Sequence, residues 1–290
     1  MWMLFACGAA FFAGVTAVLA KAGIRHTDST VATALRTPVV LAGAWAMVLL
    51  VGSQDSLGRA DARSLVLLVL SGLATGASWL CYFRALQLGE VSKVVPIDKM
   101  STVMTVLLAV VLLGEGLSPA GGAGVALMTA GTLLMLERDD LRALPHALRG
   151  GGGWLVYALG SAVFAALTAV LGKAGIVGVD SSLGTAVRTA VVLVMAWALV
   201  LATGKWGEVR RVPRGELGWV LASGAATAAS WLCFYRALQE GPASVVVPID
   251  RLSVLVTVAF SALVLHEPVG RRYLVGLALL VAGTLALVAA

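Results

Sequence analysis

Charged residues are scarce in this chain, and their scarcity decides the class of protein. Aspartate, glutamate, lysine and arginine make up 12% of the 290 residues, whereas 60% are hydrophobic. A soluble domain has about a quarter of its residues charged, so this chain has too few to cover a surface that faces water. We therefore expect an integral membrane protein. The net charge of +6 then indicates basic loops on one side of a bilayer, and no aromatic-basic pattern predicts a nucleic-acid partner.

Several kinds of site are missing as well. The three cysteines, Cys7, Cys81 and Cys233, lie in apolar segments without metal-ligand spacing and are interpreted as small apolar residues. The three histidines lie in predicted loops without mutual spacing. No nucleophile–base constellation and no glycine loop for phosphate is visible. The sequence therefore predicts no catalytic residue, no metal, no cofactor and no direct use of ATP.

Long apolar runs fill most of the chain. A spanning helix needs about 20 apolar residues, and this template predicts an all-α polytopic protein with ten spans and short connections. The first run has no basic segment before it, so we interpret it as a span and not as a cleavable signal peptide. The predicted spans are 3–22, 31–52, 65–87, 91–113, 119–136, 154–173, 183–203, 217–239, 243–265 and 271–289.

The second half of the chain repeats the first in register. Adding 152 to a position finds its counterpart, as Pro96 and Pro248 show within two Pro-Ile-Asp tripeptides. Each copy holds five predicted spans, an odd number, so the second copy enters the membrane from the opposite face. This predicts two inverted repeats, the architecture of many secondary transporters. The predicted units are residues 1–137 and 154–290, joined by a polar, glycine-rich linker at 138–153.

Two motifs resemble a known family. The segments RALQLGEVSKVVPIDKMS and RALQEGPASVVVPIDRLS, with GE and HE closing the fourth span of each half, are similar to the EamA family of the drug/metabolite transporter superfamily. The resemblance covers essentially the whole chain. It implies a ten-helix transporter fold and the export or uptake of small metabolites. It implies no single substrate, because similar members handle amino acids, amines, sugars and drugs.

Ionisable side chains inside the predicted spans are candidates for function, because each costs about 2.5–3.5 kcal/mol to insert. Those of the first half are expected near one mouth of a transport path and their counterparts near the other, so that each half supplies a charged lock. The first set is Lys21, Arg36, Arg84, Asp98 and Lys99, and the second set is Lys173, Arg188, Arg236, Asp250 and Arg251.

The two aspartates are the strongest candidates, because a carboxylate on a short side chain cannot reach the lipid headgroups. Asp98 and Asp250 are predicted to pair with the arginines of the preceding spans, Arg84 and Arg236, or with the basic residue that follows each aspartate. The pairs would break alternately as each mouth opens. For the long basic side chains, anchoring at the membrane interface is the alternative. Proton coupling through the aspartates, uniport and exchange all agree with the sequence.

Proline, hydroxyl and aromatic side chains accompany these charges. Kinks are predicted at Pro96 and Pro248, which suit backbone that lines a cavity or is buried in protein. Hydroxyl residues follow on the face of each aspartate and either line the path or join helices. Aromatic residues of the third and eighth spans either wall the substrate cavity or pack between helices. These residues are Ser101, Ser253, Trp79, Tyr82, Trp231 and Tyr235.

Two glutamates, Glu115 and Glu267, close the fourth and ninth predicted spans. They lie at the mouth opposite to the lock of their own half. We interpret them as surface residues beside a turn, with a role at that mouth as the alternative.

The predicted path has more cations than carboxylates, which favours an anionic or zwitterionic, amino-acid-like substrate. The sequence thus predicts a secondary transporter of small metabolites that works by alternating access. A flippase for a lipid-linked or phosphate-bearing metabolite and a membrane receptor or scaffold are the alternatives. The expected partners are a small-molecule substrate, the lipid bilayer and, where transport is coupled, protons. The chain is expected to be a monomer or a homodimer.

Basic residues gather on one side of the predicted topology. The odd-numbered connections and the span ends that adjoin them contain eleven, and the even-numbered ones contain only Arg59 and Arg63. By the positive-inside rule, both termini then lie outside the cytoplasm of a plasma (inner) membrane. The family resemblance implies the opposite, because ten-span members usually have both termini inside. The eleven residues are Arg25, Lys93, Arg138, Arg142, Arg149, Lys205, Arg210, Arg211, Arg214, Arg271 and Arg272.

Overall fold

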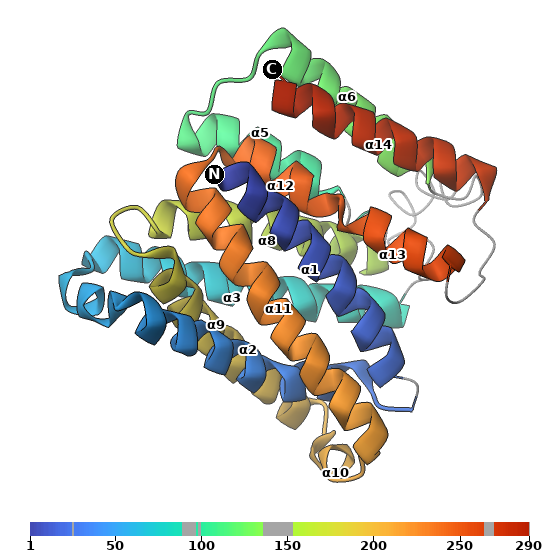
Figure 1. Cartoon of the computed structure of the whole chain (residues 1–290). Coiled ribbons are helices and arrows are strands. Elements are labelled where there is room, and N and C mark those ends of the chain that lie inside the picture. The colour runs from blue at the N-terminus through green and yellow to red at the C-terminus, as the bar shows by residue number, and fades with distance from the viewer. Residues whose placement is uncertain (25, 89–96, 98–99, 136–152, 264–269, 290) are drawn as a thin grey trace.

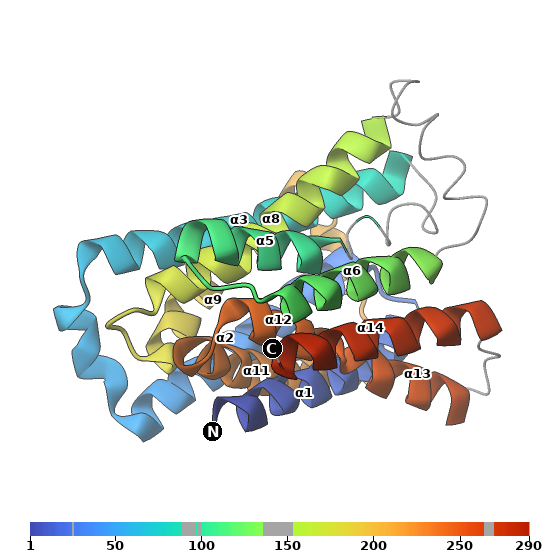
Figure 2. The ribbon, with the colours of Figure 1, turned by 90° about the horizontal axis from the view of Figure 1, so that it is seen from above.

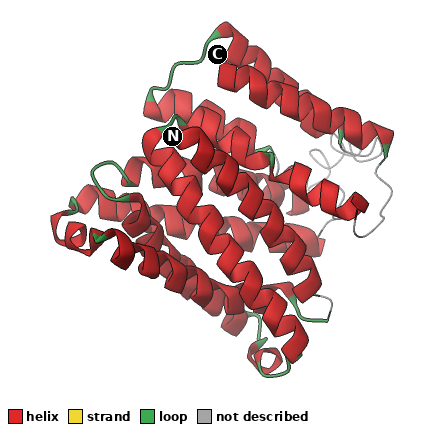
Figure 3. Ribbon diagram, in the orientation of Figure 1, coloured by secondary structure: helices red, strands yellow, loops and turns green. Residues whose placement is uncertain are grey.

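The computed structural model describes residues 1–24, 26–88, 97, 100–135, 153–263 and 270–289. Within these ranges every regular element is a helix (Figure 3), which confirms an all-α polytopic membrane protein. The elements are α1 (Trp2–Gly23), α2 (Ser29–Val51), η1 (Ser53–Arg59), α3 (Ala62–Leu88), α5 (Ser101–Leu113), α6 (Pro119–Leu134), α8 (Gly153–Gly175), α9 (Ser181–Ala202), α10 (Trp206–Val209), α11 (Arg214–Glu240), α12 (Ala243–Arg251), α13 (Ser253–Leu263) and α14 (Arg271–Ala289).

Seven of these helices are long and apolar enough to cross a membrane, namely α1, α2, α3, α8, α9, α11 and α14. Two more, α5 and α6, are apolar but shorter. The ninth predicted span appears as two helices, α12 and α13, which are interrupted at Leu252, four residues after Pro248. The predicted kink at Pro96 lies outside the described residues. The predicted count of ten spans therefore stays a prediction.

The packing of the helices repeats itself across the two halves. Helix α1 lies along α11, and its counterpart α8 lies along α3, while α2 packs on α9 and α6 on α14. Hydrogen bonds follow the same reciprocity: Ser78 Oγ donates to the Ser161 carbonyl at 3.1 Å, and Ser230 Oγ donates to the Ala9 carbonyl at 3.0 Å. Each of these residues lies 152 positions from its equivalent. Such reciprocal contacts are what a two-fold axis between the halves produces.

The two halves run in opposite directions. Helix α1 starts at the end of the bundle where the C-terminus also lies and runs to the right in Figures 1 and 2, whereas α8 runs to the left in both views. This is the arrangement that an inverted repeat requires. We call the end of the bundle with both termini and the connections 114–118, 176–180 and 241–242 the terminal end. The end with the connections 24–28 and 203–213 is called the far end.

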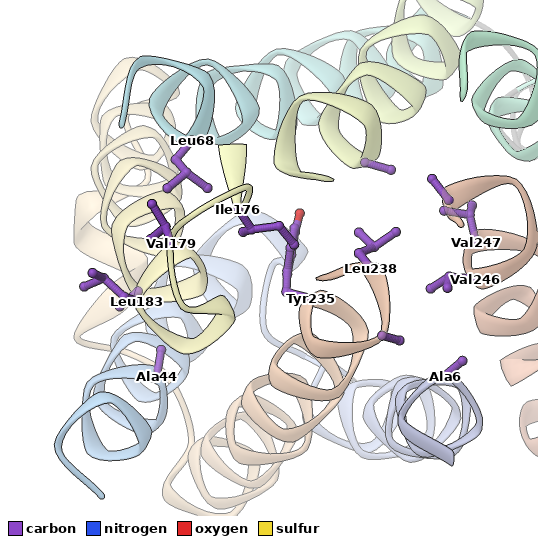
Figure 4. Packing of buried hydrophobic residues seen from close by; sticks show 14 of the residues in the cluster. Ala6, Ala44, Leu68, Ile176, Val179, Leu183, Tyr235, Leu238, Val246 and Val247 are labelled. Carbon is purple, nitrogen blue, oxygen red and sulfur yellow. The ribbon is translucent and has the colours of Figure 1, made fainter. Parts of the chain in front are cut away.

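A large apolar cluster closes the bundle towards the terminal end. Leu68, Ile176 and Val179 lie on one side of Tyr235, and Leu238 and Val247 lie on the other (Figure 4). These side chains come from α3, α8, α11 and α12 and from the connection after α8, so both halves contribute to the cluster. The cluster therefore holds the two repeats together at this end.

Small residues allow the helices to approach closely where lipid offers no hydrophobic driving force for their association. The pairing of α6 with α14 is the clearest case. A Cβ atom at Gly131 would lie 2.6 Å from the Gly276 carbonyl oxygen, and one at Gly283 would lie 2.5 Å from the Gly124 carbonyl oxygen. Any side chain at these positions has to push the two backbones apart.

We expect Gly131→Leu to separate α6 from α14 and to destabilise the protein by about 1–3 kcal/mol, the usual cost of overpacking. Thermal unfolding in detergent, followed by tryptophan fluorescence, measures the loss. Gly122→Leu on the same helix is the matched control, because nothing lies within 4 Å of a Cβ atom there. Equal losses in the two variants would show that glycine propensity, and not the helix contact, is responsible.

Candidate functional site

Arg188 is buried where the two repeats meet. Its side chain is 2% exposed, and its guanidinium carbon lies 4.7 Å from the ring centroid of Trp231 and 4.5 Å from that of Tyr235. Its Nη2 donates a hydrogen bond of 2.8 Å to Thr75 Oγ1. Trp231 and Tyr235 are one turn apart on α11, so both face the same side, while Thr75 comes from α3 of the other repeat. We call Arg188, Trp231, Tyr235 and Thr75 the Arg188 cage.

The charge of Arg188 has no counter-ion within the described part of the chain. None of the described carboxylates lies within ion-pair distance of Arg188, and its buried Nε has no hydrogen-bond partner. The ring faces stabilise a desolvated cation by about 2 kcal/mol or more, but they offer no acceptor in the plane of the guanidinium. A buried charge without a partner is costly. The cage thus lacks an acceptor for Nε and a counter-ion for the guanidinium, and an anionic group can supply both.

Tyr235 connects the cage to other elements. Its hydroxyl forms a hydrogen bond with Ser71 of α3. A Cβ atom at Gly172 of α8 would lie 2.6 Å from the Tyr235 ring, so the ring is packed directly on the α8 backbone. The structure thus brings three predicted site residues together, Arg188, Trp231 and Tyr235.

Arg36 has the equivalent position on α2, but its surroundings differ. It lines a pocket of about 150 Å³ together with Ile24, Ser29 and Ser223, and this pocket lies at the far end, beside the connection 24–28. Ile24 is 39% exposed, whereas its counterpart Ile176 is 2% exposed. Ile176 belongs to the apolar cluster that closes the terminal end. The two arginines are therefore inequivalent: space reaches Arg36, while Arg188 is enclosed.

The other predicted basic residues have different partners. Arg236 pairs with Glu240 one turn along α11, at 2.7 Å, and Arg251 Nη2 donates to Ser101 Oγ of α5 at 3.2 Å. The exposed Arg84 lies near the end of α3. The predicted pairing of the aspartates with arginines stays a prediction, because Asp98 and Lys99 lie outside the described residues.

The remaining predicted residues are spread over the bundle. Trp79 packs with Ala34 and Val200 at the contact of α2 with α9. Tyr82 packs against a second apolar cluster that contains Leu155 of α8. Ser253 is half-buried at the start of α13, directly after the helix interruption. These residues do not belong to the Arg188 cage.

Glu115 has a role that the sequence interpretation missed. Its carboxylate accepts hydrogen bonds from the backbone N–H groups of Ala243, at 2.7 Å, and Ser244, at 2.8 Å. It also lies 3.2 Å from Lys173 Nζ, and that ammonium donates to the Gly241 carbonyl. The first N–H groups of a helix lack internal partners and carry partial positive charge, so a carboxylate suits the start of α12. We call Glu115, Lys173 and these two N–H groups the Glu115 clasp.

A signal for the clasp exists in the sequence. Helix α12 starts after Gly241-Pro242, and Pro242 supplies no side-chain cap. A helix that begins without its own cap needs an acceptor from elsewhere. Recognising this need requires knowing that α12 is a separate short helix and not the middle of a long span.

The far end has polar links of its own. Glu216 at the start of α11 accepts from His26 N–H at 3.1 Å and from Thr27 Oγ1 at 2.6 Å. Its counterpart is Ser64, which donates to the Val177 carbonyl at 3.1 Å. A carboxylate therefore holds the α1–α2 connection, and a hydroxyl holds the equivalent connection at the terminal end. Among the described residues, no group of three metal-ligating side chains is found.

The comparisons with known proteins agree with this fold. Residues 1–137 and residues 152–289 both match the EamA-like transporter family. The chain is a member of the EamA-like transporter family. It is therefore a membrane transporter of the drug/metabolite transporter superfamily, which agrees with the predicted family.

Two individual proteins are similar to this EamA member. A protein of Sinorhizobium sp, described as "Uncharacterized transporter in cobO 3'region", is 45% identical over 134 residues, which are 46% of this chain and 95% of that protein. A solved structure described as "Crystal structure of protein" has a TM-score of 0.74 and 19% identity, covering 99% of this chain and 96% of its own. At that identity the likeness shows the fold alone. The cage and the clasp are thus argued from this transporter's own residues.

The clasp predicts a dependence of stability on pH. Burial raises the pKa of Glu115, but the hydrogen bonds from Ser244 and Ala243 and the charge of Lys173 outweigh it, so the pKa lies below its ordinary value of 4.5. A carboxylate with a lower pKa in the folded state stabilises the protein above its unfolded pKa. This stabilisation is lost as the pH falls through the lowered folded pKa.

We expect Glu115→Gln to destabilise this EamA member at neutral pH by about 1–3 kcal/mol, the range for a hydrogen-bonded charge. The deficit should shrink as the pH falls below 4.5 and vanish below the lowered folded pKa. Thermal unfolding in detergent over a pH series measures it. Glu240→Gln serves as control, because an exposed ion pair contributes little. A deficit that stays constant through the acid range would contradict a charged clasp.

Proposed function

We propose that this protein is a secondary transporter that moves a small anionic or zwitterionic metabolite across the plasma membrane by alternating access. The observation that carries the proposal is the Arg188 cage. A guanidinium that is buried between two aromatic rings, with an unpartnered Nε, is a binding site for a negatively charged group.

The geometry of the cage favours a carboxylate or a similar in-plane acceptor. Two aromatic rings lie within 4.7 Å of the guanidinium carbon, and Nη2 donates to Thr75. Nε is the donor without a partner, so an anion binds there. Charge-assisted hydrogen bonds of this kind are about twice as strong as neutral ones, and burial strengthens them further because water does not screen them.

The inequivalence of Arg36 and Arg188 supports alternating access. In one inverted repeat the arginine lines a pocket at the far end, and in the other it is enclosed beneath the apolar cluster of the terminal end. If the two repeats exchange these conformations, the pocket moves from one end of the bundle to the other. Transporters built from inverted repeats work in this way, with the substrate site between the repeats.

Asp250 offers a route for proton coupling within this scheme. It lies near the end of α12, and Val247 of the same helix packs in the apolar cluster that contains Tyr235. A proton on Asp250 favours the binding of an anion between the repeats because it removes a negative charge there. Uniport and exchange use the same site without this step.

We also propose that the terminal end faces away from the cytoplasm, with both termini outside it. The described far-end connections and adjoining helix starts contain Lys205, Arg210, Arg211, Arg214 and Arg271, and basic residues accumulate on the cytoplasmic side of membrane proteins.

The cage is tested by substitution of its charge. A panel of small anionic, zwitterionic and cationic metabolites is first ranked by thermal stabilisation of the wild type, since ligand at 100 times its Kd adds about 2.7 kcal/mol. We expect anionic or zwitterionic compounds to rank highest and Arg188→Met to abolish both this stabilisation and uptake of the same compound into proteoliposomes.

The stability of Arg188→Met without ligand distinguishes a binding role from a structural one. Replacing a buried charge by an apolar side chain of similar size is often neutral or stabilising, so we expect the Tm without ligand to be retained or raised. Arg211→Met, at an exposed position, is the control. Retained stabilisation in Arg188→Met, or a preference of the wild type for simple cations, would refute the proposal.

The orientation is tested with two reporters, one active only in the cytoplasm and one active only outside it. We expect the reporter that works only outside the cytoplasm to be active when it is fused after Ala290. We expect the cytoplasmic reporter to be active when it is inserted after Val209 at the far end. Cytoplasmic activity at the C-terminus would reverse the assignment.

A further inference from the structure

Helix α12 is held at both of its ends by the other repeat. At its start, Glu115, which follows α5, accepts from Ala243 and Ser244. At its end, Arg251 donates to Ser101, the first residue of α5. The two short helices therefore lie antiparallel across the boundary between the repeats.

The seam between α5 and α12 is apolar between these two polar ends. Val246 and Val247 of α12 are buried in the cluster to which Ala109 of α5 also belongs. Apolar contacts of this kind allow one helix to move along or away from another without leaving a polar group unsatisfied. The polar contacts between α12 and α5 are therefore found at the two ends of the seam, and they are the contacts that a single substitution can remove without changing the apolar packing.

The clasp joins three points of the chain at the terminal end. Lys173 is in the last turn of α8, Gly241 is in the connection between α11 and α12, and Glu115 follows α5. The side chain of Glu115 is 12% exposed, and that of Lys173 is 21% exposed. Because Pro242 offers no cap, departure of Glu115 leaves the N–H groups of α12 without this partner.

Helix α12 also connects the clasp to the cage, because Val247 of α12 and Tyr235 belong to the same apolar cluster. A displacement of α12 therefore changes the surroundings of Tyr235. The clasp thus lies at the start of α12, and the same short helix packs towards the cage through this cluster.

We propose that Glu115 is the gating residue of the terminal end: it holds α12 against α5 across the two repeats, and this end opens when Glu115 leaves α12. The proposal rests on alternating access and assigns a residue to its closing step. The sequence has the same residue types, Lys21 and Glu267, at the 152-residue offset, although Glu267 lies outside the described residues.

The accessibility of a buried cysteine measures how often the terminal end opens, and this measurement does not require the substrate to be known. In a background with Cys7, Cys81 and Cys233 replaced by alanine, we introduce Val179→Cys. Val179 is 2% exposed, lies in the connection at the terminal end and belongs to the apolar cluster. The rate at which a membrane-impermeant maleimide labels this cysteine in proteoliposomes measures how often the end is open.

We expect Glu115→Gln to raise the labelling rate about tenfold, because it removes hydrogen bonds to a charged group. Glu240→Gln is the matched control: it removes a carboxylate at the same end whose ion pair stays within α11, and we expect no change. Glu115→Asp keeps the charge on a shorter side chain and is expected to fall between Glu115→Gln and the parent. Equal rates in Glu115→Gln and Glu240→Gln would overturn the proposal.

Lys173→Gln covers the case in which Glu115→Gln does not fold. It leaves the carboxylate on α12 and removes the ion pair and the hydrogen bond from Lys173 to the Gly241 carbonyl. We therefore expect a smaller increase in the same direction, and a rate equal to that of Glu240→Gln would also overturn the gate. Failure of the substrate proposal is distinguishable, because it appears as retained ligand stabilisation in Arg188→Met, whereas failure of the gate appears only in the labelling rates.

Discussion

Attraction between a cation and two aromatic faces keeps Arg188 inside a bundle where water cannot solvate it, and much of the surrounding packing serves that contact. Gly172 lets the ring of Tyr235 lie on α8, and a Cβ atom at Gly72 of α3 would come within 2.9 Å of the Arg188 carbonyl oxygen. Small residues thus bring three helices from two repeats close enough to surround one guanidinium. The charge remains incompletely satisfied, which is a common property of binding sites that are completed by a ligand.

The cage and the clasp illustrate two solutions to the same problem. A polar group in a membrane interior must be satisfied by protein, ligand or enclosed water. At the clasp, protein does so fully: a carboxylate, an ammonium and the start of a helix satisfy one another. At the cage, the described part of the protein supplies no acceptor for Nε of Arg188. A transporter needs both, because its closing contacts must form without substrate and its binding contacts must not.

The sequence predicted the class, the family and the duplication, because apolar runs and the 152-residue offset are properties of the chain alone. It also named Arg188, Trp231 and Tyr235 as candidates, since charges and aromatic residues are unusual in a span. It did not predict that these three form one contact, because the rotation of α9 relative to α11 is set by packing. The role of Glu115 was missed for a different reason. The ninth span was interpreted as one helix, and only the interruption at Leu252 makes α12 a separate helix with a start of its own.

The unequal links of the two connections have a kinetic consequence. Glu216 holds the α1–α2 connection with charged hydrogen bonds, whereas its counterpart Ser64 makes a single neutral one. In the alternating-access scheme proposed above, links of unequal strength give the two conformations unequal free energies, so the carrier rests more often in one of them. Half-saturation would then differ between the two sides of the membrane. The equilibrium distribution of the substrate would be unchanged, because it depends on the electrochemical gradient and not on the carrier; the divergence of the repeats would change only the rate in each direction.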